Sequence, residues 1–142
     1  MFLLDTDHLG ILKRQTGSEL ERLLQRIAGR NNQDFYVSII SFHEQIRACT
    51  AYLNKRSDSA GVIQAYQQLE DLLTDYAQSQ VLPFGEAADE VFRELKQQKI
   101  RVGTMDLRIG AIGIANGMTV LTRNTVDFER IPGLSFEDWT TL

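Results

Sequence analysis

Several features that mark other classes of protein are scarce in this chain of 142 residues. It has one cysteine, Cys49, which cannot form an intramolecular disulfide, and this fits a reducing compartment. The first residues lack a basic region, and their apolar stretch is interrupted at Asp5, too early for a signal peptide. No apolar run approaches the length of a membrane span, and two prolines leave little room for a linker. We therefore expect a single cytoplasmic domain over residues 1–142, with no membrane partner.

Positive charge is also in short supply. The chain has 15 basic and 19 acidic residues, a net charge of −4, which argues against broad electrostatic capture of nucleic acid. A nuclease is still compatible with this balance, because a bound metal would neutralise part of the acidity and basic residues could line one groove. Hydrophobic residues make up 43% of the chain, which is normal for a globular protein with a core.

Short apolar runs alternate with helical patterns along the chain. Strands are expected at residues 2–4, 35–38, 80–82, 119–122 and 134–136. Helices are expected after a cap at Thr6 or Asp7, over 18–29, from a cap at Ser41 to about 53, over 60–78 and 88–98, from a cap at Thr104 to 116, and as a turn at 124–129. This alternation predicts an α/β fold, a three-layer α/β/α sandwich around a central, mostly parallel sheet.

Four acidic residues lie where apolar runs give way to loops or helices: Asp5, Glu44, Asp106 and Asp127. A parallel sheet gathers its strand ends along one edge, so these side chains could converge there. Two carboxylates about 4 Å apart repel by roughly 4 kcal/mol at an effective dielectric constant near 20. A hard divalent cation would offset that cost, so the pattern predicts metal-dependent phosphate chemistry.

Each acidic residue also has an ordinary structural explanation. Glu44 follows Ser41 by three residues, the spacing of a capping box. Asp106 lies in a first helical turn, where the helix dipole stabilises a carboxylate by roughly 0.3–1 kcal/mol. Asp127 fits a turn, and Asp7 fits either a helix cap or a carboxylate that supports the site.

The two histidines, His8 and His43, lack zinc-like spacing with each other or with Cys49. Zinc is therefore disfavoured, and His8 looks isolated. Cys49 is expected to be a small buried residue on a helix.

Several stretches together resemble the PIN domain, and specifically the toxins of VapC-type toxin–antitoxin pairs. The resemblance rests on Leu3-Leu-Asp-Thr6, Val37-Ser-Ile-Ile-Ser-Phe-His-Glu44, Gly103-Thr-Met-Asp-Leu-Arg-Ile-Gly-Ala111, Ala115-Asn-Gly-Met-Thr-Val-Leu-Thr-Arg-Asn124, Asp127-Phe-Glu-Arg-Ile-Pro-Gly-Leu134 and a late Trp139. It spans essentially the whole chain, with the helical middle matching in pattern rather than in motif.

The resemblance implies a metal-dependent endoribonuclease. Asp5, Glu44 and Asp106 match the three core acidic residues of the family, and Asp127 matches a less uniform fourth. Thr6 and Asn124 match polar positions that assist the site. The resemblance also implies RNA as substrate, a homodimer, and inhibition by a cognate antitoxin protein.

The expected cofactor is Mg²⁺, with Mn²⁺ as a substitute, because Mg²⁺ prefers octahedral oxygen ligands and keeps several waters. The family often has Asn where this chain has Asp7, which leaves the role of Asp7 open. Arg108 and Arg123 are candidates for phosphate contacts because they lie near the acidic residues in sequence.

Two other functions compete with this interpretation. A haloacid-dehalogenase-like phosphatase would use Asp5 as nucleophile and Asp7 as acid–base, although the late strand ends in Thr122-Arg-Asn124 without the acidic pair that such enzymes want. A catalytically inactive PIN-like binding module would need no cation site, and the full acidic set argues against it.

Overall fold

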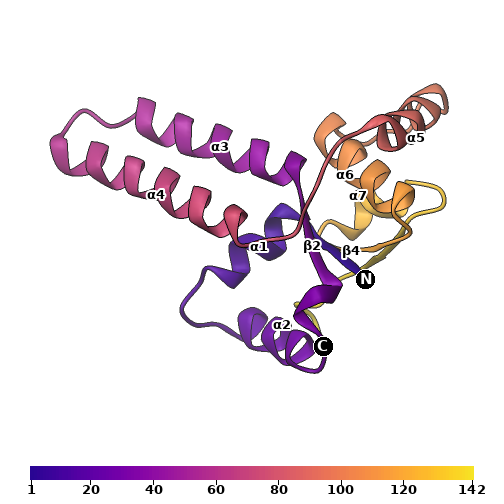
Figure 1. Cartoon of the computed structure of the whole chain (residues 1–142), viewed down its shortest axis with the longest axis horizontal. Helices are drawn as coiled ribbons and strands as arrows, with labels where there is room; N and C mark the ends of the chain where they lie inside the picture. Colours follow the sequence, from indigo (N-terminus) through magenta and orange to yellow (C-terminus); the bar gives the residue numbers. More distant parts are fainter.

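The computed structural model describes all residues 1–142 and contains one five-stranded parallel sheet with the strand order β3-β2-β1-β4-β5 (Figure 1). The strands are β1 Phe2–Leu4, β2 Phe35–Ser38, β3 Val81–Leu82, β4 Thr119–Leu121 and β5 Ser135–Glu137. The central strand β1 pairs with β2 on one side and with β4 on the other, with Leu4 opposite Leu121. The sheet thus grows outward from β1 in both directions.

Seven α-helices and one 3₁₀ turn connect these strands. They are α1 Thr6–Leu12, α2 Ser18–Ala28, the 3₁₀ turn η1 Asn32–Asp34, α3 Ile39–Asn54, α4 Ser59–Ala77, α5 Glu86–Gln97, α6 Thr104–Ala115 and α7 Thr125–Glu129. No helix is both long enough and apolar enough to span a membrane.

Helices cover both faces of the sheet because successive strand residues point to opposite sides. Leu3 and Val120 pack into one core with residues of α3, α5, α6 and α7. Leu4 and Leu121 pack into a second core with α1, α2 and Trp139. The predicted α/β fold, a parallel sheet flanked by helices, is confirmed.

Helix α6 packs closely against β4 and against the segment that follows α7 because two of its residues are glycines. A Cβ added at Gly113 would lie 2.8 Å from Val120 Cγ2, and one added at Gly110 would lie 2.8 Å from Ile131 Cδ1. Such distances are below the ordinary contact of two carbon atoms. Gly113 thus lets α6 pack directly on Val120 of β4, and Gly110 lets it pack on Ile131.

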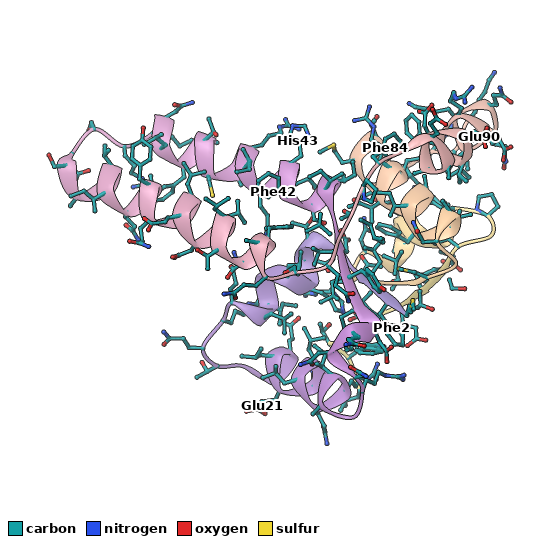
Figure 2. All side chains as sticks on the ribbon, in the orientation of Figure 1. Phe2, Glu21, Phe42, His43, Phe84 and Glu90 are labelled. Atoms are coloured by element: carbon teal, nitrogen blue, oxygen red, sulfur yellow. The ribbon has the colours of Figure 1, made fainter.

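The hairpin of α3 and α4 projects away from the sheet (Figure 1). Its base is held by Phe42 and Tyr76, whose ring centroids lie 4.9 Å apart in an edge-on arrangement. Figure 2 shows Phe42 on the side of α3 that faces α4 and His43 on the opposite side. His43 is exposed and takes no part in the core.

Several predicted helix caps are wrong. Ser38, not Ser41, caps α3, because the Ser38 side chain accepts the Ser41 N–H at 3.1 Å. Asp5, rather than Thr6 or Asp7, caps α1. Helix α6 begins after Gly103 without any side-chain cap, so Thr104 is its first residue. In each case the residue that ends a strand or loop is the cap, one to three positions earlier than its helical periodicity indicates.

Candidate active site

The strand order reverses at the carboxyl ends of β1 and β4, where open α/β sheets commonly bind ligands. Asp5 directly follows β1, and its N–H donates to the Leu121 carbonyl at 2.9 Å. Thr122 directly follows β4 and is buried. The chain therefore brings a carboxylate and a hydroxyl together at this point from positions 117 residues apart.

Asp5 is held at both carboxylate oxygens. Its Oδ1 accepts the Thr6 N–H at 2.7 Å, and its Oδ2 accepts the Thr122 hydroxyl at 2.8 Å. Only 5% of Asp5 is exposed. Burial, and next the nearby charge of Asp7, raise the pKa of Asp5 to about 7, although the two hydrogen bonds act to lower it.

Glu44 joins the site through Thr6. The Thr6 hydroxyl lies 3.0 Å from Glu44 Oε1 and 3.0 Å from Ser41 Oγ. An ionised carboxylate only accepts, so the single hydroxyl hydrogen of Thr6 goes to Glu44, and Ser41 donates to Thr6. The capping-box explanation of Glu44 is wrong, because Ser38 caps this helix and the Glu44 side chain turns to α1 instead.

Asp106 and Asp127 are bridged by one amide. Asn124 Nδ2 donates to Asp106 Oδ2 at 3.2 Å and to Asp127 Oδ2 at 2.9 Å. The Asn124 Oδ1 also caps α7 by accepting the Asp127 N–H at 3.4 Å. Burial raises the pKa of Asp106, and the charges of Glu44 and Asp127 act in the same direction.

These contacts bring all six predicted site residues into one region. The charge of Asp106 acts to raise the pKa of Asp5, and the charges of Glu44 and Asp127 act to raise the pKa of Asp106. Thr6 and Asn124 supply the neutral donors between them. The fold thus brings together four carboxylates that lie far apart in the sequence.

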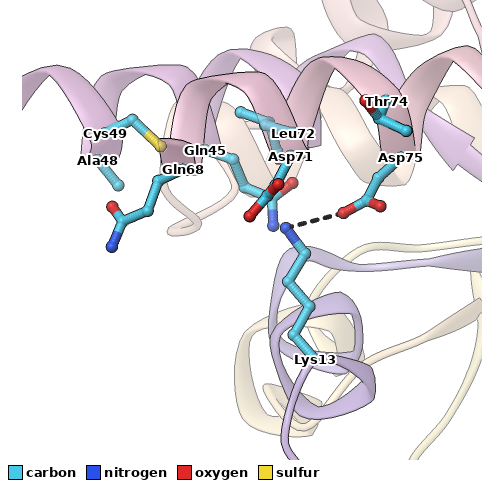
Figure 3. A pocket seen from close by; sticks show the side chains of 9 residues that line it. All are labelled: Lys13, Gln45, Ala48, Cys49, Gln68, Asp71, Leu72, Thr74 and Asp75. Carbon is cyan, nitrogen blue, oxygen red and sulfur yellow. Dashed lines mark ion pairs between the residues drawn. The ribbon is translucent and has the colours of Figure 1, made fainter. Parts of the chain in front are cut away.

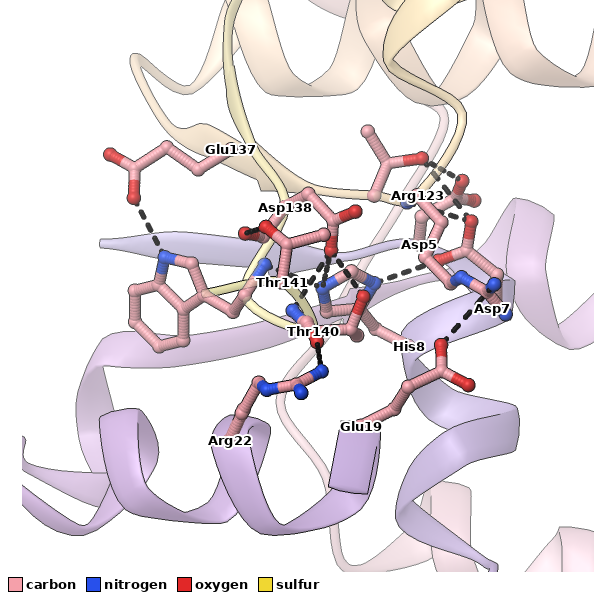
Figure 4. A network of polar contacts seen from close by, with 12 residues as sticks. Asp5, Asp7, His8, Glu19, Arg22, Arg123, Glu137, Asp138, Thr140 and Thr141 are labelled. Atoms are coloured by element: carbon pink, nitrogen blue, oxygen red, sulfur yellow. Dashed lines mark hydrogen bonds and ion pairs between the residues drawn. The ribbon is translucent and has the colours of Figure 1, made fainter. Parts of the chain in front are cut away.

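Asp7 is neither a helix cap nor a free carboxylate (Figure 4). Its Oδ1 pairs with His8 Nδ1 at 2.8 Å, and its Oδ2 accepts the Arg123 N–H at 2.9 Å. Burial acts to raise the pKa of Asp7, but the bonds from His8 and Arg123 outweigh it and hold the pKa below its usual range. His8 is not isolated as predicted, since it is fully buried and contacts both Asp7 and Trp139.

The sequence interpretation missed three supporting residues, Ser38, Ser41 and Thr122. All three are fully buried and hydrogen-bonded to one another or to a site residue. The signal for Ser38 and Thr122 was present, since a polar residue directly after an apolar strand stands at the same edge of the sheet as Asp5. Ser41 gave no such signal, because its position depends on the true start of α3.

The predicted phosphate-contacting arginines are engaged elsewhere in the structure. Arg123 Nη2 pairs with Glu19 Oε2 at 3.2 Å. The Arg108 guanidinium lies over the Phe92 ring, 5.3 Å from its centroid. Their role toward phosphate stays a prediction.

No three His, Cys, Asp or Glu side chains are close enough to hold a metal ion as they stand. The carboxylates are instead spaced by the hydrogen-bond donors Thr6, Thr122 and Asn124. The donor set nevertheless fits a hard cation, because it consists of carboxylate oxygens with no nearby thiolate and with His8 already occupied. Burial first, and then the charges of Asp7 and Asp106, raise the pKa of Asp5, and a bound cation would offset both effects.

A cavity of about 620 Å³ lies elsewhere, between the end of α1 and the α3–α4 hairpin (Figure 3). It is crossed by an ion pair between Lys13 Nζ and Asp75 Oδ2 at 3.3 Å. Cys49 lines it and is half-buried, so its predicted full burial is wrong. None of the lining residues belongs to the acidic site.

Thr122→Val tests how much the missed hydroxyl matters to Asp5. The change keeps the buried volume but removes the donor to Asp5 Oδ2 and the acceptor of the Asn124 N–H. We expect a loss of about 1–3 kcal/mol in the free energy of unfolding, the usual cost of an unsatisfied buried group. Denaturant titration measures it, with Thr119→Val in the preceding strand β4 as control. An effect no larger than that of the control contradicts this role of Thr122.

Fold and site together define an α/β protein with an oxygen-lined acidic site at the carboxyl edge of a parallel sheet. The family model of the PIN domain matches residues 3–134, and the chain belongs to this family. The resemblance inferred from the sequence is thereby confirmed.

Among curated proteins, the chain is 32% identical over 135 residues to the plasmid stability protein StbB of Pseudomonas syringae pv. tomato, covering 91% of each. It is 42% identical over 60 residues to ribonuclease VapC1 of Rickettsia felis, covering 38% of this chain and 43% of that protein. It is 38% identical over 50 residues to the tRNA(fMet)-specific endonuclease VapC of Salmonella typhimurium, covering 38% of that protein. The matches to the VapC ribonucleases thus span about two fifths of their length.

Solved structures agree in fold over the whole chain. FitAcB from Neisseria gonorrhoeae superposes with a TM-score of 0.75 at 22% identity, covering 100% of both chains. DNA-bound VapBC from Salmonella typhimurium gives a TM-score of 0.68 at 25% identity, covering 97% of both chains. The predicted fold is supported independently of the sequence motifs.

Proposed function

We propose that this chain is a metal-dependent endoribonuclease, the toxin of a VapBC-type toxin–antitoxin pair, with Asp5, Glu44, Asp106 and Asp127 as its metal ligands and catalytic residues. The observation that carries the proposal is the convergence of four carboxylates, from four separate parts of the chain, around the donors Thr6 and Asn124. Membership of the PIN-domain family and the similarity to VapC ribonucleases support it.

The chain's own residues prepare the site in three ways. Thr122 and the Thr6 N–H fix the two oxygens of Asp5, so the carboxylate does not rotate freely. Thr6 fixes Glu44, and Asn124 holds Asp106 and Asp127 at a set separation. Ligands held in this way lose little conformational freedom when they bind a cation or position a substrate.

Asp5, Glu44 and Asp106 would hold Mg²⁺ or Mn²⁺, and Asp127 would complete the set. A bound divalent ion lowers the pKa of its water and offsets charge on the phosphate, which is the chemistry that phosphodiester hydrolysis requires. Asp127 also lies 3.5 Å from Arg130 Nη1, at the exposed rim of the site, and Arg130 is a candidate to approach an RNA phosphate.

Metal removal and replacement test this proposal. RNA cleavage by the purified chain should stop in EDTA and return when excess Mg²⁺ or Mn²⁺ is added. Gel analysis of a mixed RNA substrate provides the readout, and Ca²⁺ at the same concentration provides a comparison ion that prefers more ligands and longer bonds. Undiminished cleavage in chelator would exclude metal catalysis.

An antitoxin partner and a homodimeric assembly form part of the same proposal. VapBC and FitAB relatives have been crystallised as complexes, and we propose an antitoxin and a homodimeric state for this chain by that similarity. Co-expression with a small protein encoded beside it should suppress cleavage. Sedimentation equilibrium of the chain alone measures its oligomeric state.

The phosphatase alternative loses support from the environment of Asp7. It requires Asp7 to carry a proton as acid, yet His8 and Arg123 hold the pKa of Asp7 below its usual range. The alternative of an inactive binding module predicts no cation binding, so the metal titrations distinguish it from a nuclease.

A further inference from the structure

Residues 137–141, which follow β5, are tied to the rest of the molecule by arginines of α2. Arg22 Nη1 donates to the Thr140 carbonyl at 3.0 Å, and Arg26 Nη1 donates to the Asp138 carbonyl at 3.3 Å. These arginines are four residues apart and therefore lie on one face of α2. Trp139, only 1% exposed, packs its ring 4.7 Å from that of Phe2. This segment is thus fixed against the same side of the sheet that carries α1.

The fixed segment presents a backbone N–H to His8. The Trp139 N–H lies 3.3 Å from His8 Nε2, and His8 is fully buried (Figure 4). A backbone N–H only donates, so His8 Nε2 must be the accepting nitrogen. A neutral imidazole carries its proton on the other nitrogen, so His8 Nδ1 donates to Asp7 Oδ1, 2.8 Å away. The environment of His8 therefore selects one tautomer.

Asp7, oriented by His8, holds the turn that follows β4. Its Oδ2 accepts the Arg123 N–H at 2.9 Å. The residues on either side of Arg123 are Thr122, which donates to Asp5, and Asn124, which bridges Asp106 and Asp127. Two of the three donors that space the carboxylates thus sit on one short turn, and Asp7 anchors it.

We infer that His8 is a positioning residue: fixed in its Nδ1–H tautomer by the Trp139 N–H, it orients Asp7, and through Asp7 it sets the turn that arranges the acidic site. The inference concerns the proposed cation site and rests on the proposed function. His8 itself touches none of the four carboxylates proposed as ligands. Its Nε2 also lies 3.8 Å from Asp138 Oδ1, but Asp138 belongs to the segment after β5, and the contact that leads to the acidic site is the one with Asp7.

The tautomer is measured directly on the unaltered protein. In a ¹⁵N-labelled sample at neutral pH, long-range ¹H–¹⁵N correlations distinguish Nδ1–H from Nε2–H. Only two histidines contribute, and the exposed His43 supplies the internal reference. Nδ1–H at His8 is the expected result, and Nε2–H would overturn the inference whether or not the chain cleaves RNA.

Two matched variants then separate positioning from packing. His8→Asn places an amide nitrogen where Nδ1 stands and keeps a donor for Asp7, whereas His8→Gln reaches toward the Trp139 N–H and loses that donor. Both remove the buried ring, so both lower the melting temperature. Loss of an outer hydrogen-bond partner of a metal site typically weakens metal binding about 10–100-fold. We expect a loss of that order for Mn²⁺ affinity in His8→Gln, with His8→Asn close to the wild type.

Calorimetric titration with Mn²⁺ at a temperature where both variants are folded provides the readout. Equal losses in the two variants, or a larger loss in His8→Asn, would show that the ring acts by packing and would overturn the inference. If His8→Gln does not fold, the tautomer measurement decides. A wild-type chain that binds no Mn²⁺ contradicts the proposed function instead, so the two failures are distinguishable.

Discussion

Asp5→Asn and Asp106→Asn are each expected to abolish RNA cleavage while leaving the fold intact. Both side chains lie where the acidic residues converge, and an amide oxygen is a weaker ligand for a hard cation than a carboxylate. Loss of an outer hydrogen-bond partner already costs about 10–100-fold. Loss of a direct ligand should therefore reduce kcat/KM by more than about 100-fold, which a fluorogenic RNA cleavage assay measures.

The matched control for these variants is Asp58→Asn. Asp58 is exposed at the turn of the α3–α4 hairpin, far from the sheet, and its side chain makes no cap bond (Figure 1). The control should cleave RNA like the wild type. Circular dichroism should give the same helix content for all of these variants. Wild-type cleavage by folded Asp5→Asn or Asp106→Asn would refute the assigned roles.

The stability of the metal-free protein is expected to fall as pH rises between about 4 and 7. Asp5 has a pKa of about 7 in the folded chain against 3.8 in its unperturbed state, chiefly because it is buried. The folded state therefore binds this proton more tightly. The resulting stabilisation is complete below the unperturbed pKa of Asp5 and is lost as pH rises through its folded-state pKa. Because one pKa unit corresponds to about 1.36 kcal/mol, Asp5 alone contributes up to about 4 kcal/mol to the free energy of unfolding at low pH.

Asp5→Asn removes this group and should flatten the profile. In EDTA the variant should be more stable than the wild type near neutral pH and lose that advantage near pH 4. The raised pKa of Asp106 acts in the same direction as that of Asp5 and the lowered pKa of Asp7 acts against it, and both groups are kept in the variant. Urea denaturation across this pH range measures the difference. A wild-type stability that rises from pH 4 to 7 would contradict the raised pKa of the buried Asp5.

Much of the fold could be predicted because its signals are local. The apolar runs at Phe2–Leu4, Phe35–Ser38 and Thr119–Leu121 form strands where expected, and the periodicity of Ser59–Ala77 forms the longest helix. Helix starts were predicted less well. The polar residue that ends a strand or loop competes with the residues after it as cap, and geometry alone decides in favour of Ser38 over Ser41.

The acidic residues of the site could be found from the sequence, but their connections could not. Asp5 directly follows β1, Asp106 lies in the first turn of α6 and Glu44 in the second turn of α3, near the edge where a parallel sheet gathers its strand ends. The partners that hold them come from elements distant in sequence, as when Thr6 bonds Glu44 and Thr122 bonds Asp5. Such pairings depend on strand register and helix rotation, which no local pattern encodes.

Anomalous diffraction from crystals grown with Mn²⁺ tests most directly whether the four carboxylates form one cation site. We expect an anomalous peak coordinated by oxygens of Asp5, Glu44 and Asp106, within the bond lengths of a hard divalent ion. A well-ordered acidic site without a peak in saturating Mn²⁺, or a peak bound only by other residues, would contradict it.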